Sequence, residues 1–153
     1  MVLENLGAKL KETLSKVTGA LFVDEKLVNE LVKDLQKALM KLEEALNQPA
    51  TLMNQDATIQ RYEFTFELSW KLMQSILRKN TTIVYGVKNT FREAARLNLI
   101  TNPDVWFEFL DARNLTVHTY KEEIARKVYK KAKEFPPLVK ELLEKTKQYL
   151  KNE

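Results

Sequence analysis

The chain has 153 residues, of which 44% are hydrophobic and 30% charged, with a formal net charge of +4 and no cysteine. This length suits one domain with a substantial core, and the balance is that of a water-soluble globular protein. The absence of cysteine excludes disulfides and cysteine nucleophiles, and one histidine argues against a tetrahedral zinc site. We therefore expect a cytoplasmic protein with no metal and no cofactor.

No stretch approaches 18 uncharged apolar residues, so no membrane span is expected. The N-terminus is amphipathic and carries acidic residues, which is not typical of a signal peptide. Glycine (3) and proline (4) are scarce, which favours helices throughout. The three glycines lie far apart, which excludes a glycine-rich phosphate loop.

Two helices are predicted first. Leucines and a valine repeat at spacings of three and four over residues 2–18, and Gly19 supplies a stop. Asp24 then caps a second helix, whose apolar stripe runs without a breaker to about Asn47, where Pro49 follows. This second helix is long enough to serve as a strut in a bundle.

A third helix is predicted from about Asn54 to Lys79, and it is apolar on two sides. One row is Ile59, Tyr62, Phe66, Trp70, Met73 and Leu77, and the other is Phe64, Leu68 and Leu72. Such a helix is either central or covered by a partner subunit, and we favour the partner because a small bundle has little room to enclose it. The polar strip carries Glu63, Glu67 and Lys71, for which we prefer a solvated or salt-bridged face over acid–base or metal chemistry.

The rest of the chain continues the helical pattern. Residues 81–86 form a short connection and residues 88–97 a short helix. An asparagine cap followed by proline starts a helix over about residues 103–117. The last helical region, about 120–150, should be split by the double proline at 136–137.

The segment 111–120 holds the only histidine of the chain and the candidate functional residues Arg113, Asn114, His118 and Tyr120. On an ideal helix Arg113 and His118 are offset by about 140°, so their side chains point in different directions and are badly placed to act on the same atom. They can converge only if the helix ends or bends near Thr116, or if a second subunit supplies the complementary half. The β-branched residues around this position make a break plausible.

The chemistry of this segment suits RNA cleavage or phosphate binding. Arginine holds phosphate through two donors, histidine titrates near neutrality and moves protons, and neither role requires a metal. Composition alone favours a different interpretation, in which Arg113 pairs with Asp111 or Glu108 and the histidine bonds to a helix end.

Residues 38–150 resemble the nucleotidyltransferase substrate-binding proteins, a branch of the HEPN superfamily. The matching segments are residues 59–71 (IQRYEFTFELSWK), 91–94 (FREA), 105–106 (VW) and 113–120 (RNLTVHTY). The resemblance implies an antiparallel helical bundle that forms a homodimer, with the arginine–histidine motif near the dimer interface. It also implies a minimal nucleotidyltransferase as partner.

In related toxin–antitoxin pairs the HEPN protein is a metal-independent ribonuclease toxin. Its partner silences it by transferring AMP to the tyrosine two residues beyond the histidine. The resemblance thus implies that Arg113 and His118 form the catalytic pair acting on RNA, that Asn114 supports them, and that Tyr120 accepts AMP. Some members of the family are described only as substrate-binding subunits, so an intact motif also fits a subunit without catalytic activity.

The N-terminal segment resembles the first two N-domain helices of the signal-recognition-particle GTPase. The matching segments are residues 1–7 (MVLENLG), 23–28 (VDEKLV) and 32–39 (VKDLQKAL). The GTPase domain and the methionine-rich RNA-binding domain of that protein are missing, so neither GTP hydrolysis nor signal-peptide binding is implied.

The two resemblances meet inside one unbroken helix, around Leu35 to Leu42, with no linker. Natural fusions usually join through flexible connectors, whereas a join in register within a helix is typical of design. We therefore interpret the chain as an engineered chimera; the alternative is a natural family member with an N-terminal extension.

The sequence predicts an all-α fold. An N-terminal helical hairpin (residues 1–37) shares a continuous helix with an antiparallel HEPN-type bundle (residues 38–153). Two functions remain open: a HEPN-type subunit with latent ribonuclease activity, and a structural scaffold or binding subunit that has none.

Overall fold

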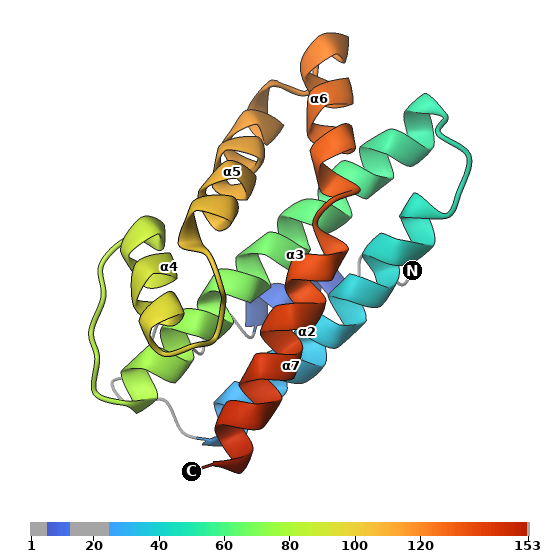
Figure 1. Ribbon diagram of the computed structural model, residues 1–153. Coiled ribbons are helices and arrows are strands. Elements are labelled where there is room, and N and C mark those ends of the chain that lie inside the picture. The colour runs from blue at the N-terminus through green and yellow to red at the C-terminus, as the bar shows by residue number, and fades with distance from the viewer. Residues whose placement is uncertain (1–5, 13–24, 153) are drawn as a thin grey trace.

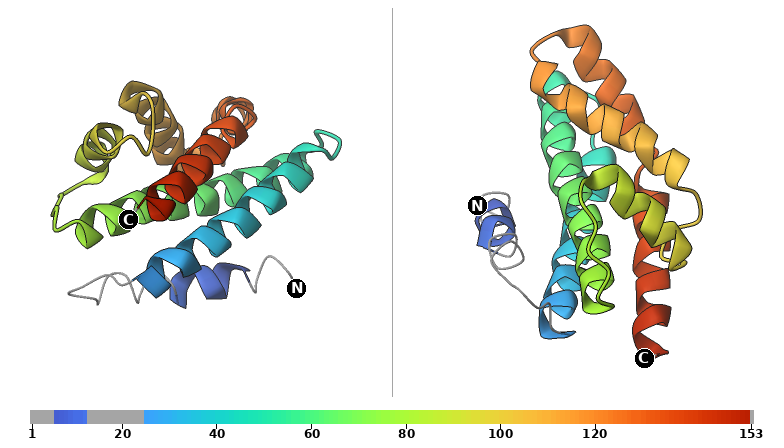
Figure 2. Two further views of the ribbon diagram at one scale, coloured as in Figure 1. Left: turned by 60° about the horizontal axis from the view of Figure 1, so that its bottom comes forward. Right: turned by 90° about the vertical axis from the view of Figure 1, so that its left-hand side faces the viewer.

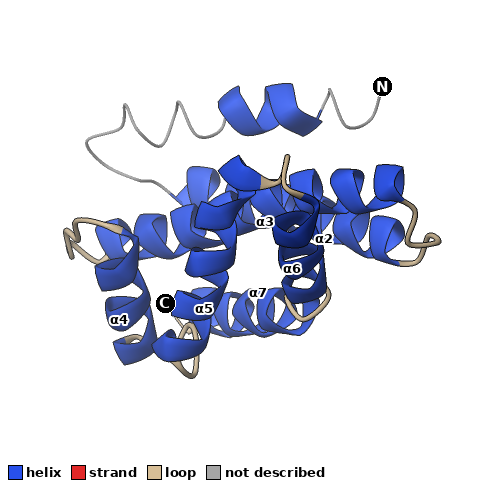
Figure 3. Cartoon of the chain, turned by 90° about the horizontal axis from the view of Figure 1, so that it is seen from above, coloured by secondary structure: helices blue, strands red, loops and turns tan. Residues whose placement is uncertain are grey.

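The computed structural model describes residues 6–12 and 25–152, and every regular element in these two ranges is helical (Figure 3). The elements are α2 (Glu25–Leu46), α3 (Leu52–Lys79), α4 (Val87–Arg96), α5 (Pro103–Asn114), the 3₁₀ helix η1 (Leu115–His118), α6 (Glu122–Ala132) and α7 (Pro136–Lys151). Residues 6–12 are helical as well. The predicted all-α fold is confirmed. None of the helices described has the length and apolar character that crossing a membrane requires.

The helix boundaries follow from local side-chain chemistry. The Thr51 hydroxyl caps α3 by accepting a hydrogen bond from the backbone N–H of Asn54, and the Asn102 amide oxygen caps α5 in the same way. The double proline separates α6 from α7, as predicted, because proline cannot continue a preceding helix. The predicted stop at Gly19 and the predicted cap at Asp24 lie outside the described residues.

Helix α3 is the central element. Helix α2 runs along one side of it, and α4, α5 and α6 pack against it elsewhere (Figure 1). Both of its apolar rows pack against other elements of the same chain. Leu68 and Leu72 are fully buried, while Phe64 and Trp70 are half-buried. The expectation that a partner subunit covers the second row is therefore wrong for its two leucines, because elements of the same chain enclose them.

Aromatic rings fill the space between α3 and the C-terminal half of the chain. Phe135, fully buried between α6 and α7, has its ring centroid within 6.1 Å of those of four other rings. These are the rings of Tyr62, Phe66, Trp106 and Phe109. The Tyr62 hydroxyl donates a hydrogen bond to the Phe109 carbonyl, which ties α3 to α5 inside this cluster. Burial raises the pKa of the Tyr62 phenol, so it remains a donor.

The segment 6–12 packs against the long helical pair formed by α2 and α3, on the side away from α4 (Figure 2). Leu6 and Leu10 are buried, and the Lys9 ammonium lies 3.2 Å from the carboxylate of buried Asp34 on α2. A Cβ atom added at Gly7 would lie 3.7 Å from the Phe64 ring, so the segment also touches α3. The predicted join at residues 37 and 38 falls inside α2, which is unbroken there.

Replacing Phe135 by alanine tests the aromatic cluster. We expect Phe135→Ala to lower the free energy of unfolding by about 3–5 kcal/mol, because four ring contacts are lost and a cavity is left. Urea unfolding followed by circular dichroism measures this change. Met53→Ala is the control, since Met53 is 81% exposed, and it should change stability by less than about 0.5 kcal/mol. Equal stability of the two variants would contradict the central role of Phe135.

Candidate functional site

The candidate residues lie where an α-helix ends. Helix α5 stops at Asn114, and the next four residues form η1. The Thr116 hydroxyl donates to the Arg113 carbonyl at 2.7 Å and the Thr119 hydroxyl donates to the Thr116 carbonyl at 3.0 Å. These bonds satisfy carbonyls that the end of the helix leaves without a partner. The α-helix is three residues shorter than predicted, and the end that convergence requires near Thr116 is present.

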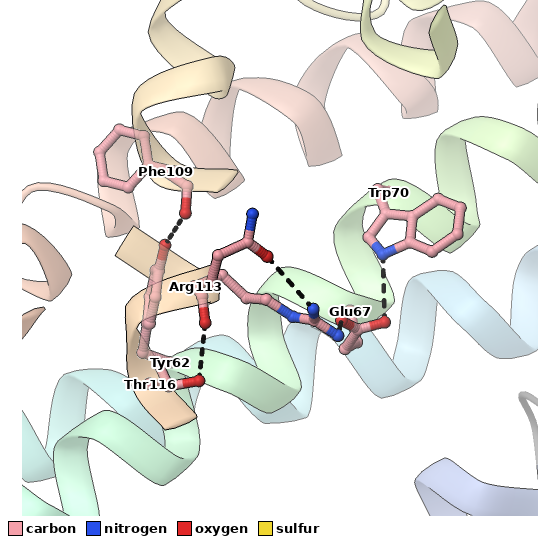
Figure 4. A network of polar contacts seen from close by, with 7 residues as sticks. Tyr62, Glu67, Trp70, Phe109, Arg113 and Thr116 are labelled. Atoms are coloured by element: carbon pink, nitrogen blue, oxygen red, sulfur yellow. Dashed lines mark hydrogen bonds and ion pairs between the residues drawn. The ribbon is translucent and has the colours of Figure 1, made fainter. Parts of the chain in front are cut away.

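Arg113 forms an ion pair with Glu67 on α3 (Figure 4). The other carboxylate oxygen of Glu67 accepts a hydrogen bond from the Trp70 indole N–H at 3.1 Å, and Arg113 also donates to the Asn114 amide oxygen at 3.5 Å. The arginine side chain remains 41% exposed and that of Glu67 20% exposed. The predicted pairing of Arg113 with Asp111 or Glu108 is wrong, because Arg113 lies on the side of α5 that faces α3.

The polar strip of α3 forms a salt bridge through Glu67, which agrees with the interpretation preferred from the sequence. Its side chains are half-buried. Burial raises the pKa of the Glu63 carboxyl, against the opposing effects of the Thr116 side chain and the Arg113 charge. Burial also lowers the pKa of Lys71, whose ammonium lies 4.1 Å from the centre of the Trp70 ring. Within residues 6–12 and 25–152, no three acidic, histidine or cysteine side chains converge so as to hold a metal ion.

An open cavity of about 1010 Å³ lies beside Arg113, between the segment 6–12, α3 and the corner of α5 and η1. Its lining residues are Gly7, Ala8, Leu10, Lys11, Gln60, Glu63, Phe64, Glu67, Arg113, Asn114, Thr116 and Val117. The cavity therefore contains two cations and two carboxylates beside an apolar wall. The N-terminal segment supplies one of the cations, Lys11, and no pattern in the sequence connects it with Arg113.

Tyr120 lies at a second, smaller cavity of about 390 Å³, and Gln60 and Glu63 line both cavities. His118 lines neither cavity; it is exposed, with its ring edge-on to the Tyr120 ring at 6.1 Å. The structure thus brings Arg113 together with Asn114, and His118 together with Tyr120. Neither of these two cavities is lined by both Arg113 and His118.

Sequence reasoning missed Glu67 as the partner of Arg113. The spacing of the polar strip on α3 was visible, but a helical period shows which face a residue occupies and not which distant helix meets it. The arrangement as it stands offers an exposed guanidinium edge for an oxyanion, an exposed imidazole for proton transfer and an exposed phenol that can be modified.

A double-mutant cycle measures the ion pair of Arg113 and Glu67. We expect Glu67→Gln and Arg113→Ala to be coupled by about 1 kcal/mol in the free energy of unfolding, because both groups are partly shielded from water. The control cycle joins Glu93→Gln with Arg96→Ala, whose ion pair of 3.1 Å includes an arginine that is 78% exposed. That coupling should be below about 0.5 kcal/mol. Equal couplings would show that the Glu67 pair is only a surface contact.

Comparisons with known proteins identify the family of the chain. Residues 30–148 match the family model described as nucleotidyltransferase substrate binding protein like. A Haemophilus influenzae protein named "Probable ribonuclease HepT" is 42% identical over 82 residues, which are 50% of this chain and 56% of that protein. The chain therefore spans little more than half the length of that relative.

A solved structure from the same organism, described as the fold of a substrate binding domain of a nucleotidyltransferase, superposes with a TM-score of 0.68. It is 31% identical, and the match covers 74% of this chain and 97% of that one. The signal recognition particle 54 kDa protein of Thermoplasma volcanium is 49% identical over 41 residues, 27% of this chain but 9% of that protein. This partial match supports the resemblance of the N-terminal segment. With most of its length matched in sequence and in fold, the chain belongs to the nucleotidyltransferase substrate binding protein-like family.

Proposed function

We propose that this chain is a HEPN-type subunit that acts with a nucleotidyltransferase and cleaves RNA through Arg113 and His118 without a metal. The observation that carries the proposal is the end of α5 at Asn114, which leaves four groups on one corner of the bundle: the guanidinium, the Asn114 amide, the imidazole and the Tyr120 phenol. Each group is exposed to solvent in full or in part, so each can meet a substrate or a partner.

The proposed reaction is an internal transesterification of RNA. The 2′-hydroxyl attacks the adjacent phosphorus, a P–O2′ bond forms and the P–O5′ bond breaks, leaving a 2′,3′-cyclic phosphate and a free 5′-hydroxyl. His118 removes the 2′-hydroxyl proton, while Arg113 stabilises the charge that develops on the phosphate oxygens. The departing 5′ oxygen takes a proton from water or from the imidazolium of a second copy. Asn114 supports the guanidinium through its amide oxygen.

A homodimer is part of the proposal. Arg113 lines the larger of the two cavities described above and His118 lines neither, and a second copy placed against this corner would bring the two residues together. Val117 is an apolar side chain on this corner that is 72% exposed, and a second copy would shield it from water.

The alternative is a binding subunit or a scaffold without catalysis, and one observation favours it. The ion pair with Glu67 neutralises Arg113, and a phosphate must compete with that carboxylate for the guanidinium. An engineered join within α2 fits the same alternative, because the first 37 residues would then have a purely structural role. For both functions the cytoplasm is the predicted location.

The cleavage test uses purified full-length chain and a labelled single-stranded RNA. We expect Arg113→Ala and His118→Ala each to reduce the cleavage rate by at least about 100-fold, because charge stabilisation and proton transfer are each lost. Lys127→Ala is the control for loss of one positive charge on the outer face of α6. Cleavage that persists in the double variant Arg113→Ala/His118→Ala would exclude these residues as the source of the activity and leave the binding subunit.

The modification test concerns Tyr120. The phenol oxygen is expected to attack the α-phosphorus of ATP bound to the nucleotidyltransferase, forming an O–P bond as pyrophosphate leaves and the phenol proton is released. Tyr120→Phe should abolish the mass increase of one AMP group. Tyr85→Phe is the matched control, since Tyr85 is 81% exposed, and it should leave the mass increase unchanged. AMP transfer that survives in Tyr120→Phe, or that is lost in Tyr85→Phe, would reject Tyr120 as the acceptor.

A further inference from the structure

Two cationic side chains of α4 lie close to an aromatic ring of α5 where the two helices meet. The Lys88 ammonium lies 5.9 Å and the Arg92 guanidinium carbon 5.2 Å from the centre of the Phe107 ring. Tyr85, directly before α4, is exposed and adds a second ring. Tyr85, Lys88, Arg92 and Phe107 are called the α4 patch below. The two helices that carry it run side by side at the surface (Figure 2).

The guanidinium of the α4 patch is held in place before any ligand arrives. Arg92 donates a hydrogen bond to the Asn89 side-chain oxygen at 2.8 Å, and the Asn89 amide group donates to the Tyr85 carbonyl at 3.1 Å. The Phe107 ring supports the same guanidinium from below, and Arg92 is exposed. A guanidinium that is already ordered loses little conformational entropy when a planar group stacks on it.

The α4 patch lies on the same side of α5 as Asn114, whereas Arg113, six residues after Phe107, lies about 120° away around the helix axis. Phe107 and Asn114 are seven residues apart, so they differ by about 20° around the helix axis and by about 10 Å along it. Asn114 in turn contacts Arg113. A flexible chain lying along this side of α5 can therefore contact the α4 patch and the Asn114 amide, and it must bend around the helix to reach the Arg113 guanidinium.

The charges beside the α4 patch are of both signs. Asp104, Glu108 and Asp111 are exposed and lie within about 60° of one another on the neighbouring outer strip of α5. They repel phosphates, whereas Lys88 and Arg92 attract them. The combination of ordered cations with aromatic rings is the one that proteins use to bind single-stranded nucleic acid, where bases stack and phosphates pair with lysine or arginine.

We propose that the α4 patch binds single-stranded RNA. Bases stack on Tyr85 and on the outer plane of Arg92, and Lys88 contacts a backbone phosphate. This inference rests on the proposed function for the identity of the ligand, but it concerns binding, and binding is measured without cleavage.

The experiment uses the full chain with His118→Ala, so that the RNA stays intact, and the fluorescence anisotropy of a labelled single-stranded RNA of mixed sequence. Adding Lys88→Ala/Arg92→Ala should raise Kd at least about tenfold, since a stacking group and a phosphate contact are removed. The slope of log Kd against log salt should fall by about 0.7, from one lost phosphate contact. The matched control, Lys127→Ala/Lys130→Ala on α6, removes the same charge and should change Kd less than about twofold.

Tyr85→Ala provides a second test that does not depend on charge. It should weaken binding about fivefold or more through lost stacking, and leave thermal unfolding unchanged because Tyr85 is exposed. Equal effects of the α4 and α6 double variants, or no RNA binding by the His118→Ala chain, would overturn the proposal. So would an unchanged Kd for RNA with loss of a nucleotidyltransferase in a pull-down, which would make the α4 patch a protein interface. RNA that binds through the α4 patch but is never cleaved would reject the ribonuclease function alone.

Discussion

The burial of α3 on two sides is the constraint on which the other elements depend. A helix that hides both apolar rows needs neighbours on both, and α2 meets one while α4, α5 and α6 meet the other. Phe135 completes the enclosure by joining the rings of α3 and α5, which fixes the distance between these helices. Because α5 is held in this position, its last turn delivers Arg113 to Glu67.

This enclosure gives the candidate site a guanidinium that is already engaged. Glu67 is anchored by the Trp70 indole, so the carboxylate is not free to swing away when an anion arrives. A phosphate must share Arg113 with it, and sharing is easiest along the exposed edge of the guanidinium. The same carboxylate keeps the arginine in one place, which lowers the entropic cost of binding. The contact with Glu67 therefore both holds Arg113 in place and competes with phosphate for its guanidinium.

The sequence predicted the elements well and the contacts between distant elements poorly. The helical period, the Asn102-Pro103 start and the double proline each act within a few residues, so these features can be recognised in the sequence alone. The motif from Arg113 to Tyr120 was also found in the sequence. The partner of Arg113 was not, because Glu67 lies 46 residues away and depends on how α5 packs on α3. The burial of Leu68 and Leu72 inside the chain depends on the same packing.

Because α2 is unbroken, the position of the segment that lines the cavity depends on the number of residues in this helix. Asp34 lies on α2 and meets Lys9 of the segment that carries Lys11. One residue inserted between Asp34 and Leu42 would rotate everything before it by about 100° and shift it by about 1.5 Å. Leu27, Val28 and Leu31 would then turn away from α3, and the segment would leave the cavity. A substitution at the same place changes one side chain but leaves the register of the helix unchanged.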